Sequence, residues 1–177
     1  MILSLLFHVF SLLNAQDVKQ HSVALIPYPV TLVEGEGAFV FSEKTVVALE
    51  DNELEPIARD FVELFTEPAG FTPKLKVKSK KGEVYLMKDD SFQEEGYALE
   101  VTPEKIVVKA AGVKGAFYAL QTLRQLLPSD IEGNECKPDV IWKVPSVRVT
   151  DEPRFGYRGL MVDVARYFIT KEHLMRI

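Results

Sequence analysis

A short apolar run near the C-terminus holds the residues best suited to chemistry. The run spans residues 160–164 and contains a single acid, Asp163, while Arg166 follows its end. Its length fits one strand that is buried on both faces. Thr170 and Glu172 then predict the start of a helix, as N-cap and first-turn acid. This order of strand, polar residues and helix is typical of a parallel β/α unit, in which functional groups lie at the C-terminal ends of strands.

Pairs of adjacent acids could supply a general acid and a general base. Three such pairs are Asp89-Asp90, Glu94-Glu95 and Asp151-Glu152. All three fall in segments that the chain's pattern predicts to be turns or linkers. Because nothing marks any of them as an acid/base pair, we expect no catalytic residue among them.

Histidine and cysteine are too sparse to indicate a metal site. The three histidines are His8, His21 and His173, and none belongs to an H-E-x-x-H pattern. The single cysteine, Cys136, excludes an intrachain disulfide, and no histidine lies near it in sequence to activate its thiol. The sequence therefore supports neither a metal site nor a nucleophilic cysteine.

The segment around the apolar run resembles a known family. Residues 152–168 read EPRFGYRGLMVDVARYF, which is similar to the opening of the catalytic barrel in glycoside hydrolase family 20, the β-N-acetylhexosaminidases. The segment departs from the family pattern at Ala165, usually Ser, and at Tyr167, usually His. Residues 115–127, GAFYALQTLRQLL, are similar to the helix that closes the non-catalytic domain in many members.

The resemblance implies roles for three residues. Arg166 matches the family's arginine that hydrogen-bonds the hydroxyls of the terminal sugar, and a guanidinium offers paired donors that suit vicinal oxygens. The alternative is a structural arginine paired with a buried acid such as Asp163. We expect Asp163 to give structural support, since a buried carboxylate needs a cation or several donors. Arg158 lies at the start of the strand, on the stability face of a barrel, and is assigned no sugar contact.

The resemblance also implies the chemistry of the complete enzyme. Family members hydrolyse terminal N-acetylglucosamine or N-acetylgalactosamine with retention and without a cofactor, using the substrate's own acetamido carbonyl as nucleophile. An Asp-Glu pair on a later barrel strand assists, and that strand would lie beyond Ile177. The expected partner is a glycan with a terminal N-acetylhexosamine, and this fragment alone should be inactive.

Composition and the N-terminus point to an exported protein. A net charge of -5 and a pI near 5.3 argue against a nucleic-acid partner, which requires a basic surface. Residues 2–13 form an apolar run too short to cross a bilayer, and residues 1–15 predict a signal peptide cleaved after Ala15. The alternative is an N-terminal core helix. We expect a mature protein without a membrane anchor, in the periplasm or outside the cell.

Residues 22–150 predict one α+β domain, the zincin-like support domain that the resemblance implies. Apolar residues recur at helical spacing over 53–66 and 116–127, which predicts two amphipathic helices on one face of a sheet. Asn52 is expected to cap the first helix, with Glu55 three residues later. Residues 151–177 would then begin a truncated (β/α)8 barrel.

Short apolar stretches predict the strands of that sheet. The candidates are 30–33, 39–41, 45–49, 75–78, 84–87, 97–102, 106–110 and 140–149. Hairpins are expected between 75–78 and 84–87 and between 97–102 and 106–110. The lysines over 74–81 fit a half-exposed edge strand better than an anion site.

Two other functions stay open at this level. One is a secreted module without enzymatic activity that binds glycans or a protein partner. An apolar strand at 160–164 with no sheet to enter argues against it, because such a strand would promote aggregation. The other is a different glycosidase that shares the same support domain.

Overall fold

The sheet contains seven strands. The computed structural model describes residues 23–176, so the expected signal peptide, His8 and His21 lie outside the described residues. The strands follow the order β1-β7-β5-β6-β4-β2-β3 across the sheet. They are β1 (Thr31–Val40), β2 (Val46–Leu49), β3 (Lys74–Lys76), β4 (Val84–Lys88), β5 (Tyr97–Val101), β6 (Ile106–Ala110) and β7 (Lys143–Asp151).

The sheet is half antiparallel and half parallel. Strand β7 pairs antiparallel with both β1 and β5, and β5 pairs antiparallel with β6. Strands β6, β4, β2 and β3 are parallel to one another. The last strand in sequence thus lies beside the first, and its C-terminal end carries the chain out of the domain.

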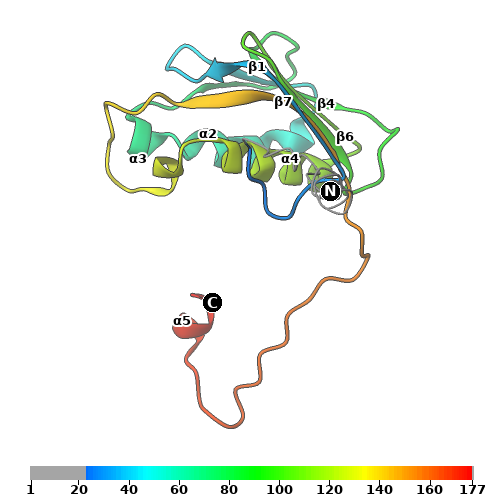
Figure 1. Ribbon diagram of the computed structural model, residues 1–177, viewed down its shortest axis with the longest axis vertical. Coiled ribbons are helices and arrows are strands. Elements are labelled where there is room, and N and C mark those ends of the chain that lie inside the picture. The colour runs from blue at the N-terminus through cyan, green and yellow to red at the C-terminus, as the bar shows by residue number, and fades with distance from the viewer. Residues whose placement is uncertain (1–22, 177) are drawn as a thin grey trace, which may run out of the picture.

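The long helices cover one face of the sheet, as Figure 1 shows for α2 and α4. The helical segments are η1 (Asn52–Leu54), α2 (Glu55–Glu63), α3 (Thr66–Ala69), α4 (Val113–Leu126), η2 (Ser129–Glu132) and α5 (Lys171–Leu174). The expected α+β domain with two helices on one face is confirmed. No helix within residues 23–176 combines the length and the apolarity needed to cross a bilayer.

An aromatic cluster fills the core between α2 and the sheet. The ring of Phe65 is fully buried, and its centroid lies 4.8 Å from that of Phe41, 5.8 Å from that of Phe61 and 6.2 Å from that of Trp142. Burial of one such ring contributes about 1.5–3 kcal/mol, and edge-on pairs add to it. The amphipathic stripe over 53–66 therefore belongs to the core, as its spacing predicts.

The first two predicted strands are wrong as separate elements. Residues 30–33 and 39–41 contribute to one strand, β1, which runs through the intervening turn-prone residues Glu34-Gly35-Glu36-Gly37. Its pairing with β7 is irregular between Glu34 and Ala38, where β1 carries extra residues. A bulge absorbs the glycines without reversing the chain, because Gly37 adopts a φ of 83°.

The predicted hairpin of residues 75–78 and 84–87 is also wrong. Strands β3 and β4 both run parallel to β2 and lie on either side of it, so they do not pair with each other. The lysine-rich segment between β3 and β4 does turn the chain, but it carries the chain across β2 to the other side instead of closing a hairpin. Strand β3 does lie at the sheet edge, as its lysines predict. The second hairpin, β5 with β6, is confirmed.

The first predicted helix is divided and differently capped. Residues 53–66 contain the end of η1, all of α2 and the start of α3. The side chain of Asp51, not of Asn52, accepts a hydrogen bond from the backbone N–H of Glu53. Pro56 falls in the first turn of α2, where its missing N–H costs no helical hydrogen bond.

The apolar strand predicted over 160–164 does not form in this chain. Leu160 and Met161 are 81% and 92% exposed, and the backbone there has no sheet partner among the described residues. A strand needs a neighbour for its N–H and C=O groups, and the edges of the sheet lie elsewhere. Thr170 does cap a helix, since its side chain accepts from the N–H of His173 at the start of α5.

Helix α4 approaches strand β5 so closely that only glycine fits at one position. A Cβ on Gly115 would lie 2.3 Å from the carbonyl oxygen of Gly96. Alanine is the better helix former, so propensity alone would favour it at this position. We predict instead that Gly115→Ala lowers the free energy of unfolding by about 1–3 kcal/mol, because backbone must move to relieve the overlap.

Gly112 gives the matched control for this substitution. It precedes the same helix in extended backbone, and no atom lies within 4 Å of its added Cβ. Gly112 is the N-cap of α4, where alanine is less favourable than glycine, so urea unfolding should show a loss of no more than about 1 kcal/mol for Gly112→Ala, smaller than the loss for Gly115→Ala. Equal effects of the two substitutions would contradict the close approach.

Candidate functional site

The two predicted site residues lie in the segment that follows the sheet. Asp163 and Arg166 are both exposed there. The Asp163 carboxylate accepts a hydrogen bond of 2.8 Å from the N–H of Ala165, a neighbour in its own segment, rather than from Arg166. The structure therefore does not bring the two side chains together, and their roles in sugar binding and structural support stay predictions.

The adjacent acids are engaged in local structure. Asp89 accepts from the hydroxyl and the N–H of Ser91, and the hydroxyl contact is the main reason that its pKa is lowered. Glu94 forms an ion pair with Lys114 at 2.9 Å. These contacts fit turn and surface roles, as expected. Within the described part of the chain, no three His, Cys, Asp or Glu residues are grouped to hold a metal ion.

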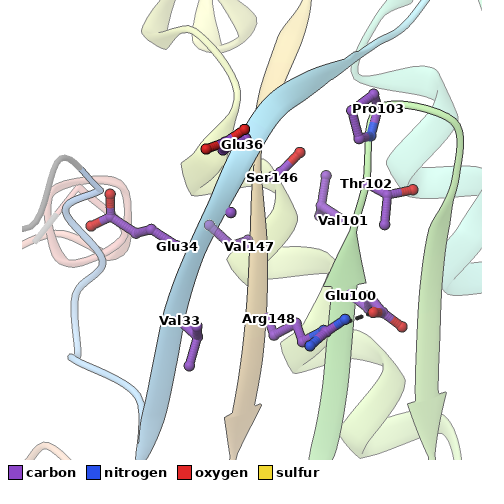
Figure 2. A pocket seen from close by; sticks show the side chains of 11 residues that line it. Val33, Glu34, Glu36, Glu100, Val101, Thr102, Pro103, Ser146, Val147 and Arg148 are labelled. Carbon is purple, nitrogen blue, oxygen red and sulfur yellow. Dashed lines mark hydrogen bonds and ion pairs between the residues drawn. The ribbon is translucent and has the colours of Figure 1, made fainter.

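Figure 2 shows a groove of about 240 Å³ over strands β1, β7 and β5. The Glu100 carboxylate accepts from the Nε of Arg148 at 2.8 Å at one end of it. Near the other end, a Cβ on Gly37 would lie 2.8 Å from Cγ of Pro103. The buried hydroxyl of Ser146 lines the groove and has no hydrogen-bond partner among the described residues. The groove combines the ion pair of Glu100 and Arg148 with small apolar surfaces, and the side chains of Glu34 and Glu36 also line it.

A larger hollow of about 710 Å³ lies where the chain leaves the sheet. Its walls come from the N-terminal segment 25–30, helix α4 and the linker 151–158. Pro27, Tyr28 and Phe155 give it apolar surface, and Phe155 is 66% exposed. Three segments distant in sequence thus meet at one end of the domain. The place where residues 25–30, helix α4 and residues 151–158 meet is called the corner below.

Helix α4 holds the N-terminal segment in this place. The side-chain amide of Gln125 accepts from the N–H of Ile26 and donates to its C=O, each at 3.0 Å. Asp151, the last residue of β7, accepts from the N–H of Val30 at 3.1 Å. Both ends of the domain are therefore tied to the same corner.

Arg158 ties the linker to that corner. One terminal nitrogen of its guanidinium donates to the Glu95 carboxylate at 2.9 Å and to the Tyr118 hydroxyl at 3.1 Å. The other donates to the C=O of Phe155 at 2.6 Å. The hydrogen bond to Glu95 is the main reason that the pKa of Arg158 is raised, with that to Tyr118 second. Arg158 thus connects the linker to a turn before β5 and to helix α4.

The sequence does not reveal this cluster. The sequence places Arg158 at the start of a barrel strand and Glu95 in a turn or linker. The two residues lie 63 positions apart, and no local spacing connects them. Only the meeting of the turn, helix α4 and the linker brings their charges together.

A buried tyrosine lies beneath the same corner. The hydroxyl groups of Tyr97 and Thr122 are 2.6 Å apart, and Tyr97 is only 3% exposed. Burial raises the pKa of Tyr97 to about 12, against a lowering effect of the Thr122 contact and with a further raising effect of Asp151. The neutral phenol is therefore the form that the fold accommodates.

The sequence of this chain matches a known protein family over most of its length. Residues 22–152 match glycosyl hydrolase family 20, domain 2. The match covers the sheet and the helices on its face and ends where the linker begins.

Curated relatives with similar sequences are hexosaminidases. The chain is 32% identical over 160 residues to a beta-hexosaminidase of Porphyromonas gingivalis, covering 87% of this chain and 20% of that protein. It is 29% identical to an N,N'-diacetylchitobiase of Vibrio harveyi, covering 92% of this chain and 17% of that protein. The chain thus spans about a fifth of the length of these relatives.

Solved structures that are similar to this chain are also hexosaminidases. The N-acetyl-beta-hexosaminidase of Streptomyces plicatus, in complex with Thio-NAglucal, superposes with a TM-score of 0.76 at 27% identity, over 86% of this chain and 30% of that one. The exo beta-N-acetylglucosaminidase of Vibrio harveyi, in complex with N-acetylglucosamine, has a TM-score of 0.69 at 28% identity, over 88% and 23%.

The buried tyrosine predicts a loss of stability at high pH. Burial raises the pKa of Tyr97 from its ordinary value of 10.0 to about 12. Its stabilising effect is complete below pH 10 and declines as the pH rises from 10 to 12, because only the unfolded chain then loses the proton readily.

A comparison with Tyr97→Phe isolates this effect from the titration of lysines. Between pH 10 and pH 12, the wild type should lose about 1.4 kcal/mol of unfolding free energy per pH unit relative to the variant, as measured by urea unfolding. Parallel pH profiles for the two proteins would contradict the raised pKa.

Proposed function

Because this chain belongs to glycosyl hydrolase family 20, we propose that it is the front of a β-N-acetylhexosaminidase, which removes terminal N-acetylglucosamine or N-acetylgalactosamine from glycans. The observation that carries this proposal is the family match over residues 22–152, followed at once by the segment PRFGYRGLMVDVAR. The described domain is the non-catalytic support, and a (β/α)8 barrel that begins near residue 151 performs the hydrolysis.

The proposed chemistry uses groups of the substrate and of the barrel. The substrate's acetamido carbonyl attacks the anomeric carbon, while a barrel glutamate protonates the leaving oxygen and a neighbouring aspartate orients the acetamido group. Water then opens the cyclic intermediate with overall retention. No cofactor takes part, and residues 23–176 do not supply the acid/base pair.

Arg166 is the substrate-binding residue that this chain contributes. Once residues 160–164 enter a barrel, its guanidinium lies at the C-terminal end of the first strand, where it donates to hydroxyls of the terminal sugar. Asp163, within the same strand, becomes buried and gives structural support. The exposure of Leu160 and Met161 supports this proposal, because such apolar side chains need a sheet to cover them.

The protein is proposed to act outside the cytoplasm. Residues 1–15 carry the apolar run and the small residue of a cleavable signal peptide. A glycan with a terminal N-acetylhexosamine would be met in the periplasm or outside the cell.

Expression of the complete reading frame tests the activity. The product should hydrolyse an aryl β-N-acetylglucosaminide with retention, and a thiazoline that mimics the cyclic intermediate should inhibit it. The 177-residue chain alone should show no hydrolysis. A complete product without hydrolysis would reject the enzyme and favour the glycan- or protein-binding module.

Arg166→Ala in that complete product tests the sugar contact. Two charge-assisted hydrogen bonds contribute about 3 kcal/mol together, so kcat/KM should fall by about 100-fold. Arg59→Ala is the control, because Arg59 lies on the exposed surface of α2, where it pairs with Glu55 of the same helix. An equal kcat/KM for the two variants would remove Arg166 from the binding site.

A further inference from the structure

Helix α4 and the turn before β5 form a rigid base for one ion pair. Glu95 belongs to the turn that ends at Gly96, and Gly96 contacts Gly115 at the start of α4. Tyr118 lies one helical turn further along α4 and is partly buried. A carboxylate and a phenol are thus held side by side, on elements that cannot separate without disturbing the core.

Arg158 occupies both of these acceptors at once. Its guanidinium donates to Glu95 and to the Tyr118 hydroxyl, and its Cζ lies 5.9 Å from the centroid of the Tyr118 ring. A third hydrogen bond, to the C=O of Phe155, curls the linker back on itself. The side chain of Arg158 is 41% exposed and that of Glu95 only 28%, so the pair is partly shielded from solvent.

Arg158 lies just before the apolar run and Arg166 in the sequence. Arg158 precedes residues 160–164 by one glycine and Arg166 by eight positions. Residues 159–163, which follow Arg158, are all exposed, and Leu160 and Met161 are 81% and 92% exposed. Within the described residues, Arg158 therefore holds the linker to the domain just before this exposed run.

We propose that Arg158, Glu95 and Tyr118 form a joint that fixes the direction in which the chain leaves the support domain. Arg158 is then a positioning residue: it sets the start of the strand whose far end carries Arg166. The catalytic consequence of the joint rests on the proposed function, whereas its existence does not.

Limited trypsin digestion of the 177-residue chain tests the joint directly. Trypsin must take an arginine side chain into its own pocket, so the contacts of Arg158 should slow cleavage after it, while cleavage after the exposed Arg166 proceeds freely. Mass spectrometry of early fragments gives the ratio of the two rates. In Glu95→Gln this ratio should rise by about three- to five-fold, the range expected for losing an exposed ion pair with a hydrogen-bonded partner.

Glu94→Gln is the matched control. It removes the same charge one residue earlier, and Glu94 pairs with Lys114 rather than with the linker. The ratio should stay at the wild-type value. Tyr118→Phe keeps the ring and removes only the hydroxyl, so it should give a smaller rise than Glu95→Gln. Equal ratios in Glu95→Gln and Glu94→Gln would overturn the joint.

The complete reading frame tests the positioning role. Glu95→Gln should lower kcat/KM by about three- to ten-fold, whereas Glu94→Gln should leave it unchanged. The double variant Glu95→Arg with Arg158→Glu restores an ion pair of reversed polarity, so its kcat/KM should recover most of what Glu95→Gln loses. Loss without recovery by the reversed pair would reject positioning. A complete product that is inactive would reject the proposed function alone, because the trypsin result does not depend on hydrolysis.

Discussion

The corner at which the chain leaves this domain depends on how closely helix α4 approaches strand β5. The carbonyl of Gly96 leaves no room for a side chain on Gly115, so the helix and the turn before β5 meet backbone to backbone. From this fixed position α4 reaches three other segments. Gln125 holds the N-terminal segment, Thr122 meets the buried phenol of β5, and Tyr118 meets the linker. One close contact thus organises groups from four parts of the chain.

Local pattern was sufficient to predict most elements but not their neighbours. The helical spacing over 116–127 and the alternation of β5 and β6 identify core faces, because side chains on those elements meet a single apolar interior. The turn signals after 75–78 and at Glu34–Gly37 misled, since a glycine or lysine cluster fits a bulge or a parallel crossing as well as a hairpin. Strand order arises from contacts between distant segments, and no local window contains them.

The candidate site divides in the same way. Arg166 could be proposed from sequence because its motif is continuous along the chain, and its role in sugar binding stays a prediction, since the family match covers residues 22–152 only. The partners of Arg158 could not, because Glu95 and Tyr118 come from a turn and a helix that only the fold brings together. Asp51 replaced the expected cap of the first helix for a smaller reason, a shift of one residue that either side chain could satisfy.

The position of β7 determines when the first strand can pair during synthesis of the chain. Strand β1 is at the edge of the sheet, and its neighbour there is β7, so that Thr31 pairs with Thr150. During synthesis from the N-terminus, residues 31–40 therefore wait without a partner until nearly the whole domain has been made. The pairing that then completes the sheet also places Asp151 at the corner and starts the linker there. The last strand to be synthesised therefore both completes the sheet beside β1 and leads the chain into the linker.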